Sequence, residues 1–557
     1  MKKSILIAGV ALVLALTGLW FYGRPAYKRF KETRFIEQAS KAMAKGDYRL
    51  ASLSARQAWQ LNPRNLEACR LLAEMAEASR SPSVLDWRRR AADIAPTIEN
   101  KLLVAGAALG VQAPPYPLAA QTLEDLRDSA KNVTAYHVVS AELAMRLNHV
   151  SEAAAQFEEA SRLEPSNELH QVNLSVLRLQ STNASLAAQA QAALERLSAS
   201  TNVGAVALRW LVAERLRQGD LPGAERFSSE LLGNPQAAIE DRLQHLTILQ
   251  RAKRQEADAF LSALQNQAAT NAAQIYQVSA WMIAHGQADR VLAWLAKCPS
   301  RTKGEMPAPL AFVDGYVAEK DWAGLETFLQ GQQWGEREYL RLALLSRAAS
   351  EQNHELSAAA QWRAAVREAG DRLGPLTALL KMAGSWAPQK AREDLLWLIA
   401  ERFPRERWAL QELERLYVGS GNTRGLNKLS ATIVSNDPRN FIERKNVAAT
   451  ALLLKINLVQ AHEIAKEVYA EHPEDPSIAA TYAYSLYLQG RIKDGLAALE
   501  RLQPKAFENP AVVLYYGVLL AGDGQTNKAV AQLKMARQPD LLPEEKALLD
   551  AALATVE

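Results

Sequence analysis

The sequence has little cysteine and few strand-forming residues. Cys69 and Cys298 are its only cysteines in 557 residues, too few and too far apart to suggest a disulfide framework or a cysteine-based metal site. Val, Ile and Thr are sparse beyond the N-terminus, whereas Ala, Leu, Glu, Gln and Arg, which lose little side-chain freedom in a helix, are abundant. The composition therefore predicts an almost purely helical chain.

The body of the chain also lacks an excess of positive charge. The formal net charge is +4, but residues 1–34 alone hold seven basic residues and one acidic residue. The rest of the sequence keeps 58 basic and 60 acidic residues, a net charge of −2. Because proteins that bind nucleic acid generally carry a basic patch or stripe, we expect no nucleic-acid partner.

Complete catalytic motifs are missing as well. Two His-Glu pairs begin like the helix motif of zinc proteases, at His354-Glu355 and His462-Glu463. The second histidine of that motif is absent from both, because Ala358 and Lys466 stand in its place. The sequence therefore predicts no catalytic residue, no metal and no cofactor. An enzyme with a cryptic catalytic site, assembled across distant parts of the chain, stays open as the alternative.

The N-terminus contains an apolar run. Residues Ile5 to Gly23 carry no charge, and as a helix they nearly span a hydrocarbon core of about 30 Å. Aromatic residues end the run and basic residues follow it, as at a membrane interface. Residues 1–31 are therefore predicted to form a single-pass membrane anchor with a basic flank.

Two alternatives concern this segment. The first is a cleaved signal peptide, for which Ala15 and Thr17 form a poor cleavage pair. The second concerns the side of the membrane on which the body lies. The Lys2-Lys3 start is typical of exported proteins and favours an extracytoplasmic, periplasmic body, whereas the basic residues after the run favour a cytoplasmic one.

A spacing of small residues recurs along the rest of the chain. A turn residue, two alanines and a proline follow one another at steps of five, seven and five. They are Gly46, Ala51, Ala58 and Pro63, and again Asn148, Ala153, Ala160 and Pro165. The two prolines lie 102 residues apart, which is three units of 34, and Gly490 and Gly524 are again 34 apart.

Each unit fits two antiparallel helices. A glycine or asparagine in the left-handed conformation ends the first helix, and a short turn such as Gly46-Asp47 or Gly219-Asp220 leads into the second. The alanines let the helices approach closely, and the proline ends the second helix. Closing turns are predicted at 62–65 and 437–440, and the second of them also helps to start the next helix.

This pattern resembles the tetratricopeptide repeat family, whose unit is a helix–turn–helix of about 34 residues. The resemblance implies an all-α solenoid of about fifteen units over residues 32–542, several of them degenerate, and a capping helix at 543–557. It is specific at 32–65, 134–167, 407–440 and 442–541, and weak at 97–130, 168–200 and 237–305. The proline-rich segments 113–117 and 305–309 are predicted breaks.

The resemblance also implies a function. In this family the first helix of each unit lines a concave surface that binds extended segments or helices of partner proteins. It indicates a non-enzymatic, membrane-tethered scaffold or assembly factor of bacterial type. Residues predicted to face the partner are Arg209, Tyr276, Arg347, Arg415, Tyr484 and Tyr487. Ordinary packing or solvated side chains are the alternative for each of them.

One basic run lies outside this set. Arg88, Arg89 and Arg90 follow Trp87 and have the chemistry to touch phosphates or lipid headgroups. The unit contains no other basic cluster. The run is therefore interpreted as a solvated helix face.

Overall fold

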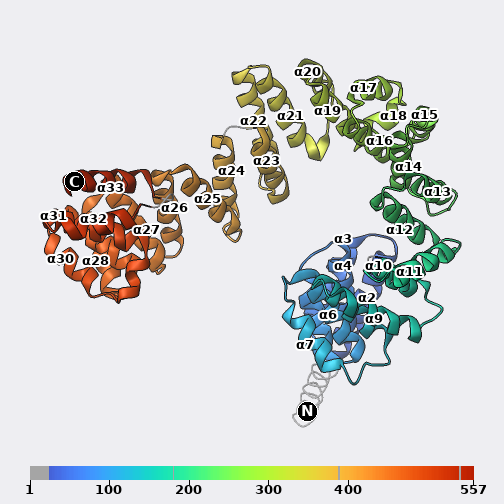
Figure 1. Cartoon of the computed structure of the whole chain (residues 1–557), viewed down its shortest axis with the longest axis horizontal. Coiled ribbons are helices and arrows are strands. Elements are labelled where there is room, and N and C mark those ends of the chain that lie inside the picture. Colours follow the sequence, from blue (N-terminus) through green and yellow to red (C-terminus); the bar gives the residue numbers. More distant parts are fainter. Residues whose placement is uncertain (1–23, 180, 387–388, 538–540, 557) are drawn as a thin grey trace, which may run out of the picture. The chain divides into compact units, whose positions relative to one another are not determined.

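The computed structural model describes residues 24–179, 181–386, 389–537 and 541–556, and this part of the chain is helical without a strand. It divides into two compact units, the first ending at Ala311 and the second starting at Phe312. Successive helices pack against each other in pairs, which follow one another along the chain (Figure 1). The predicted all-α solenoid is confirmed for the described residues.

The first unit contains eight of these pairs and one short helix in its described residues. They are α2 (Arg24–Ala44) with α3 (Tyr48–Leu61), α4 (Leu66–Ala78) with α5 (Val84–Ile94), α6 (Ile98–Val111) with α7 (Pro117–Leu126), α8 (Thr134–Arg146) with α9 (Val150–Leu163), α10 (Glu168–Leu179) with α11 (Ala184–Leu197), α12 (Gly204–Arg217) with α13 (Leu221–Leu232), α14 (Ile239–Arg251) with α15 (Ala257–Ala268), α16 (Ala272–Ala284) with α17 (Ala288–Lys297), and the short α18 (Ser300–Gly304). The boundary between the units falls inside α19 (Ala308–Glu319).

The second unit continues the pattern. Its described helices are α20 (Trp322–Gln330), α21 (Glu338–Glu351) with α22 (Glu355–Ala369), α23 (Leu373–Trp386) with α24 (Gln389–Arg402), α25 (Trp408–Ser420) with α26 (Thr423–Asn436), α27 (Phe441–Leu454) with α28 (Leu458–Glu471), α29 (Pro476–Leu488) with α30 (Ile492–Glu500), α31 (Pro510–Gly522) with α32 (Thr526–Met535), and the last helix α33 (Pro543–Val556). Short 3-10 turns lie at η2 (Gly335–Arg337) and η3 (Pro504–Glu508).

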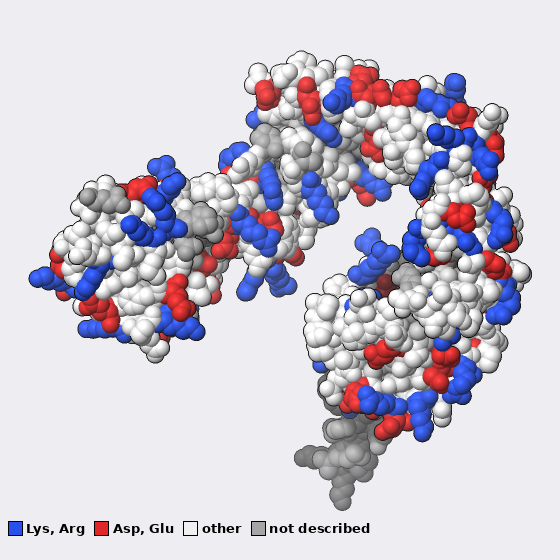
Figure 2. All heavy atoms as spheres, in the orientation of Figure 1, with Lys and Arg blue, Asp and Glu red and all other residues white. Residues whose placement is uncertain are grey.

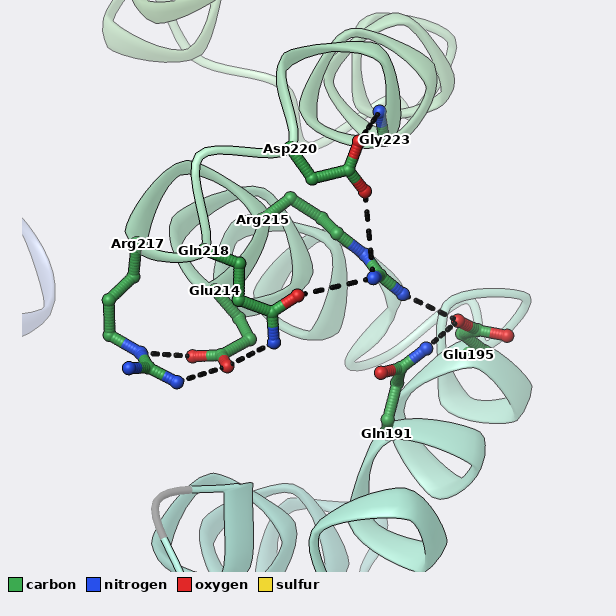
Figure 3. Close-up of polar contacts among 8 residues, drawn as sticks. All are labelled: Gln191, Glu195, Glu214, Arg215, Arg217, Gln218, Asp220 and Gly223. Carbon is green, nitrogen blue, oxygen red and sulfur yellow. Dashed lines mark hydrogen bonds and ion pairs between the residues drawn. The ribbon is translucent and has the colours of Figure 1, made fainter. Parts of the chain in front are cut away.

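The predicted turns within the pairs are confirmed. Gly46 and Gly219 have φ angles of +74° and +75°, the left-handed conformation that glycine adopts at no steric cost. Each is followed by an aspartate that caps the second helix. Asp47 accepts a hydrogen bond from the Leu50 N–H at 3.0 Å, and Asp220 accepts one from the Gly223 N–H at 2.9 Å (Figure 3). The local sequence alone therefore sets these turns.

The predicted closing turns are confirmed too. Asn65 caps α4 by accepting a hydrogen bond from the Ala68 N–H at 2.7 Å. Asn440 caps α27 by accepting one from the Glu443 N–H at 3.1 Å. Between such turns the spaced alanines are buried at the helix contacts, as Ala51 and Ala58 are with no exposed surface. Small side chains at these places let neighbouring helices approach closely.

The segments with weak repeat spacing form helix pairs as well. Residues 97–130 hold α6 and α7, residues 168–200 hold α10 and α11, and residues 237–305 hold α14 to α17. Larger apolar side chains take over from the alanines there; Leu194 and Leu197 of α11 belong to one buried cluster with residues of α12 and α13. The helix pairs therefore persist where larger side chains replace the alanines, although the alanine spacing can no longer be recognised in the sequence.

Polar side chains link successive helices along the solvent side of the contacts. Arg215 of α12 lies between Glu195 of α11, at 3.7 Å, and Asp220 at the start of α13, at 3.6 Å (Figure 3). The preceding residue, Glu214, is 8% exposed and accepts hydrogen bonds from Arg217 and Gln218. Its hydrogen bonds with Arg217 lower the pKa of Glu214. The network fixes α12 against both neighbours.

The N-terminal anchor prediction falls on residues that the structure does not describe. The described chain starts with α2 at Arg24, directly after the run from Ile5 to Gly23. Within the described ranges, no helix has the length and apolar character needed to cross a bilayer.

Candidate protein-binding surfaces

An apolar hollow of about 350 Å³ lies between first helices of successive pairs in the first unit. Its walls come from α6 and α8, with α4 and α5 at one edge. We call it the N-terminal hollow; its lining residues are Glu77, Arg88, Ile98, Glu99, Leu102, Leu103, Gly106, Ala107, Val133, Ala135 and Val139. Most of them are apolar, so the hollow is suited to an apolar side chain of a partner.

The N-terminal hollow exists because small residues stand where larger side chains would fill the space. A Cβ atom added at Gly106 would meet no other atom within 4 Å, and the neighbouring Ala107 extends no further than its methyl group. Leu103 and Val139 are half-buried and form apolar walls on either side. Two helices that packed with larger residues at these positions would close the gap.

The edge of the N-terminal hollow is polar and ordered. Arg88 is 7% exposed and donates a hydrogen bond to Oε2 of Glu77 at 2.9 Å. The guanidinium of Arg90 lies 4.9 Å from the ring centre of Trp59 and 5.1 Å from that of Trp87. The interpretation of residues 88–90 as a solvated face is therefore wrong for Arg88, whose buried side chain forms an ion pair with Glu77. Arg89 is exposed, as that interpretation expects.

Of the predicted partner-binding residues, Arg209 is tied to its own chain. Its Nε and one terminal nitrogen donate to the two carboxylate oxygens of Asp241 at 2.9 and 2.8 Å, and that nitrogen also reaches the Gln236 carbonyl at 3.0 Å. Asp241 is 5% exposed. The pair joins α12 to α14, so Arg209 holds two successive first helices together. Tyr276 lies half-buried on α16.

The two predicted arginines of the second unit differ from each other. Arg347 of α21 lies over the ring of Trp322, 5.2 Å from its centre, and 4.0 Å from Glu351. Arg415 of α25 is exposed and forms an ion pair with Glu412, to which Arg392 also comes within 3.5 Å. Arg392, Glu412 and Arg415 line a polar hollow of about 500 Å³. Of the two arginines, Arg415 is the one that is open to a partner.

Tyr484 is a core residue. It is 4% exposed and stacks on Tyr515 at a ring-centre distance of 4.7 Å, and burial raises its pKa to about 12. Tyr487, one turn along α29, is half-buried and its ring centre lies 6.2 Å from that of Tyr484. The structure brings these two tyrosines together but buries the first, so direct contact with a partner is left to Tyr487. The expectation that Tyr484 faces a partner needs this correction.

Comparison with known proteins identifies the repeat. Residues 453–512, from the end of α27 to the start of α31, match a family model described as tetratricopeptide repeat. Residues 453–512 carry a tetratricopeptide repeat. No curated protein matches it.

Solved structures that resemble the tetratricopeptide chain are remote. PilW, described as a widely conserved type IV pilus biogenesis factor, has 19% identity and a TM-score of 0.27, over 42% of this chain and 92% of its own. The Cut9-Hcn1 hetero-tetramer of APC/C has 11% identity and a TM-score of 0.27, and the match covers 91% of this chain and 96% of its own. Naa15/Naa10 bound to HypK-THB has 14% identity and a TM-score of 0.24, and the match covers 93% of this chain and 70% of its own. The family assignment rests on the repeat match.

Sequence reasoning missed the N-terminal hollow of the tetratricopeptide chain. The hollow lies partly in residues 97–130, where the repeat spacing is weak and no unit boundary is obvious. The available signal was the run of small residues from Ala105 to Ala108 in the middle of α6. Within the described ranges, no group of three or more His, Cys, Asp or Glu side chains is placed to hold a metal ion.

Charge is spread along the tetratricopeptide chain without large blocks on the face shown in Figure 2, where Lys and Arg alternate with Asp and Glu over both units. This distribution agrees with the near-zero net charge of the body. It leaves apolar shape, more than long-range charge, as the means by which the N-terminal hollow would select a partner.

Proposed function

We propose that this protein is a membrane-tethered scaffold that holds an apolar segment of a partner protein in its N-terminal hollow. The hollow is the observation that carries the proposal, because it lies on consecutive first helices, the ones that line the binding surface in this family. Tetratricopeptide arrays generally act by binding rather than catalysis, and function resides in the surface they present.

An amphipathic helix or an extended segment with one large aliphatic or aromatic anchor fits this site. Its anchor would enter the space above Gly106 and contact Leu103 and Val139. The Arg88–Glu77 ion pair at the edge is already ordered in the structure, so a polar group of the segment would meet a preorganised partner.

The tether is the run from Ile5 to Gly23, and the Lys2-Lys3 start supports a body on the extracytoplasmic side. Support for the tether itself comes from the start of α2, where Tyr27 and Phe30 are 59% and 63% exposed beside Lys28, Arg29 and Lys31. Exposed aromatic residues among cations are typical of a segment at a membrane surface.

Site-specific photo-crosslinking in cells tests the proposal. Ala135 and Ala155 are both exposed alanines of one helix pair; Ala135 lines the N-terminal hollow on α8, and Ala155 lies on the second helix α9. A photoreactive phenylalanine analogue at position 135 is expected to give a discrete crosslinked product in the membrane fraction, and the same residue at 155 none. Equal products from both positions would refute the binding surface, and a product found only in the soluble fraction would refute the tether.

A further inference from the structure

The last helix of the second unit contacts much earlier parts of the chain. α33 packs on α31 and α32, and it also reaches α27. Its Glu544 accepts a hydrogen bond from the hydroxyl of Thr423, 121 residues earlier, at the start of α26. A Cβ atom at Gly421, in the turn before α26, would lie only 3.1 Å from the Pro543 ring. The first turn of α33 therefore closes against the α25–α26 turn.

The same turn holds a half-buried carboxylate, that of Glu545. Glu545 accepts hydrogen bonds from the Tyr515 hydroxyl at 3.2 Å and from the Leu542 N–H at 3.0 Å. Burial raises the pKa of Glu545, and burial lowers the pKa of Lys445 on α27, the cation whose charge acts on it. Taking two opposite charges out of water costs free energy that their attraction only partly offsets.

An apolar face continues the contact. One buried cluster of the second unit combines α33 with helices α27 to α32. From α33 it takes Leu549, Ala552 and Leu553, and from the first helices α27, α29 and α31 it takes residues that include Leu452, Tyr484, Tyr515 and Leu519. α33 therefore shares a core with these first helices as a bound amphipathic helix would, with its buried apolar positions at steps of three and one.

A helix that only capped the last pair would need contacts with α31 and α32 alone. The contacts with Thr423, Gly421 and α27 exceed that need, and the neighbouring carboxylate of Glu545 loses hydration in the closed state, which weakens the closure. The arrangement is suited to a contact that opens and closes. In the closed state a tethered segment competes at an effective concentration of about a millimolar, which keeps other ligands out.

We propose that α33 is a reversible internal ligand of the surface formed by α27, α29 and α31, and that its release lets this surface bind an amphipathic helix of a partner protein that carries two carboxylates in its first turn. The partner chemistry copies that of the resident helix. The hydroxyls of Thr423 and Tyr515 receive the carboxylates, and Tyr484, Tyr487 and Leu519 receive the apolar face.

A labelled peptide of residues 541–557 tests the proposal with the full-length chain. In the variant Glu544→Lys/Glu545→Lys, two cations replace the carboxylates that accept from the Thr423 and Tyr515 hydroxyls, and α33 is expected to leave its surface. The variant should bind the peptide at least about tenfold more tightly than the unaltered chain does, measured by fluorescence anisotropy. A peptide with the same two charge reversals is the matched control and should bind neither chain.

Failure of the peptide to bind a variant that keeps its helical circular dichroism would overturn the proposal. Hydrogen exchange of the unaltered chain provides a second measurement that does not depend on the variant. Amides in the second half of α33 should exchange at least about tenfold faster than those of α31, because release of α33 precedes global unfolding. Equal protection of the two helices would contradict reversibility. Neither result depends on the N-terminal hollow.

Discussion

Replacing Tyr484 with alanine should lower the local free energy of unfolding around α29 and α31 by about 3 to 5 kcal/mol, the usual effect of deleting a buried aromatic ring. The side chain is 4% exposed, stacks on Tyr515 at 4.7 Å and belongs to the cluster that joins α27, α29, α31 and α33. Its removal leaves a cavity beside Tyr515, and a packed core collapses only partly into such a space.

Hydrogen exchange is the suitable measurement, because a repeat array need not unfold as one unit and local opening energies can be read amide by amide. Tyr487→Ala is the matched control on the same helix. Tyr487 is half-buried at the edge of the cluster, so its loss should cost less than half as much. Protection of α31 within about 1 kcal/mol of the unaltered chain after Tyr484→Ala would contradict the core role of Tyr484.

Replacing Arg209 with alanine should lower the local unfolding free energy around α12 and α14 by about 2 kcal/mol. The change leaves the carboxylate of Asp241, which is 5% exposed, without its two hydrogen bonds to the guanidinium. Asp241 keeps one donor, the Ala238 N–H at 2.8 Å. The cost is that of an incompletely satisfied buried charge, moderated because the Arg209 side chain is 39% exposed.

Arg415→Ala is the control for this change, since Arg415 also pairs with a carboxylate but is 71% exposed. Exposed ion pairs contribute about 0 to 1 kcal/mol, so stability should hardly change. In a double-mutant cycle, adding Asp241→Ala to Arg209→Ala should cost less than the sum of the two single changes. Additive costs would mean that the two side chains do not stabilise each other.

The helix pairs could be predicted from sequence because their signals are local. A glycine with positive φ followed by a capping aspartate, as at Gly219 and Asp220, fixes a turn whatever surrounds it. The exposure of a particular side chain is different, because it depends on helices far along the chain. Tyr484 stacks on Tyr515 of α31, and the buried cluster that contains both rings also includes residues of α33.

The ion pair of Arg209 could have been predicted from the sequence. Its partner Asp241 follows 32 residues later, close to one repeat length, so the two occupy nearly equivalent places on successive first helices. Opposite charges at such places predict a pair across the helix contact. The N-terminal hollow was harder to predict, because the space above Gly106 results from side chains that are missing on two helices at once.

Partner capture by two glycine variants of α6 tests the central claim, that the chain acts by holding a protein segment in the N-terminal hollow. A Cβ atom meets nothing within 4 Å at either Gly106 or Gly110, but only Gly106 lines the hollow. Gly106→Phe should fill the hollow and lower capture of the protein crosslinked from position 135 by at least about tenfold, with helicity unchanged. Gly110→Phe should capture that protein as well as the unaltered chain does. Equal capture by all three chains would contradict the claim.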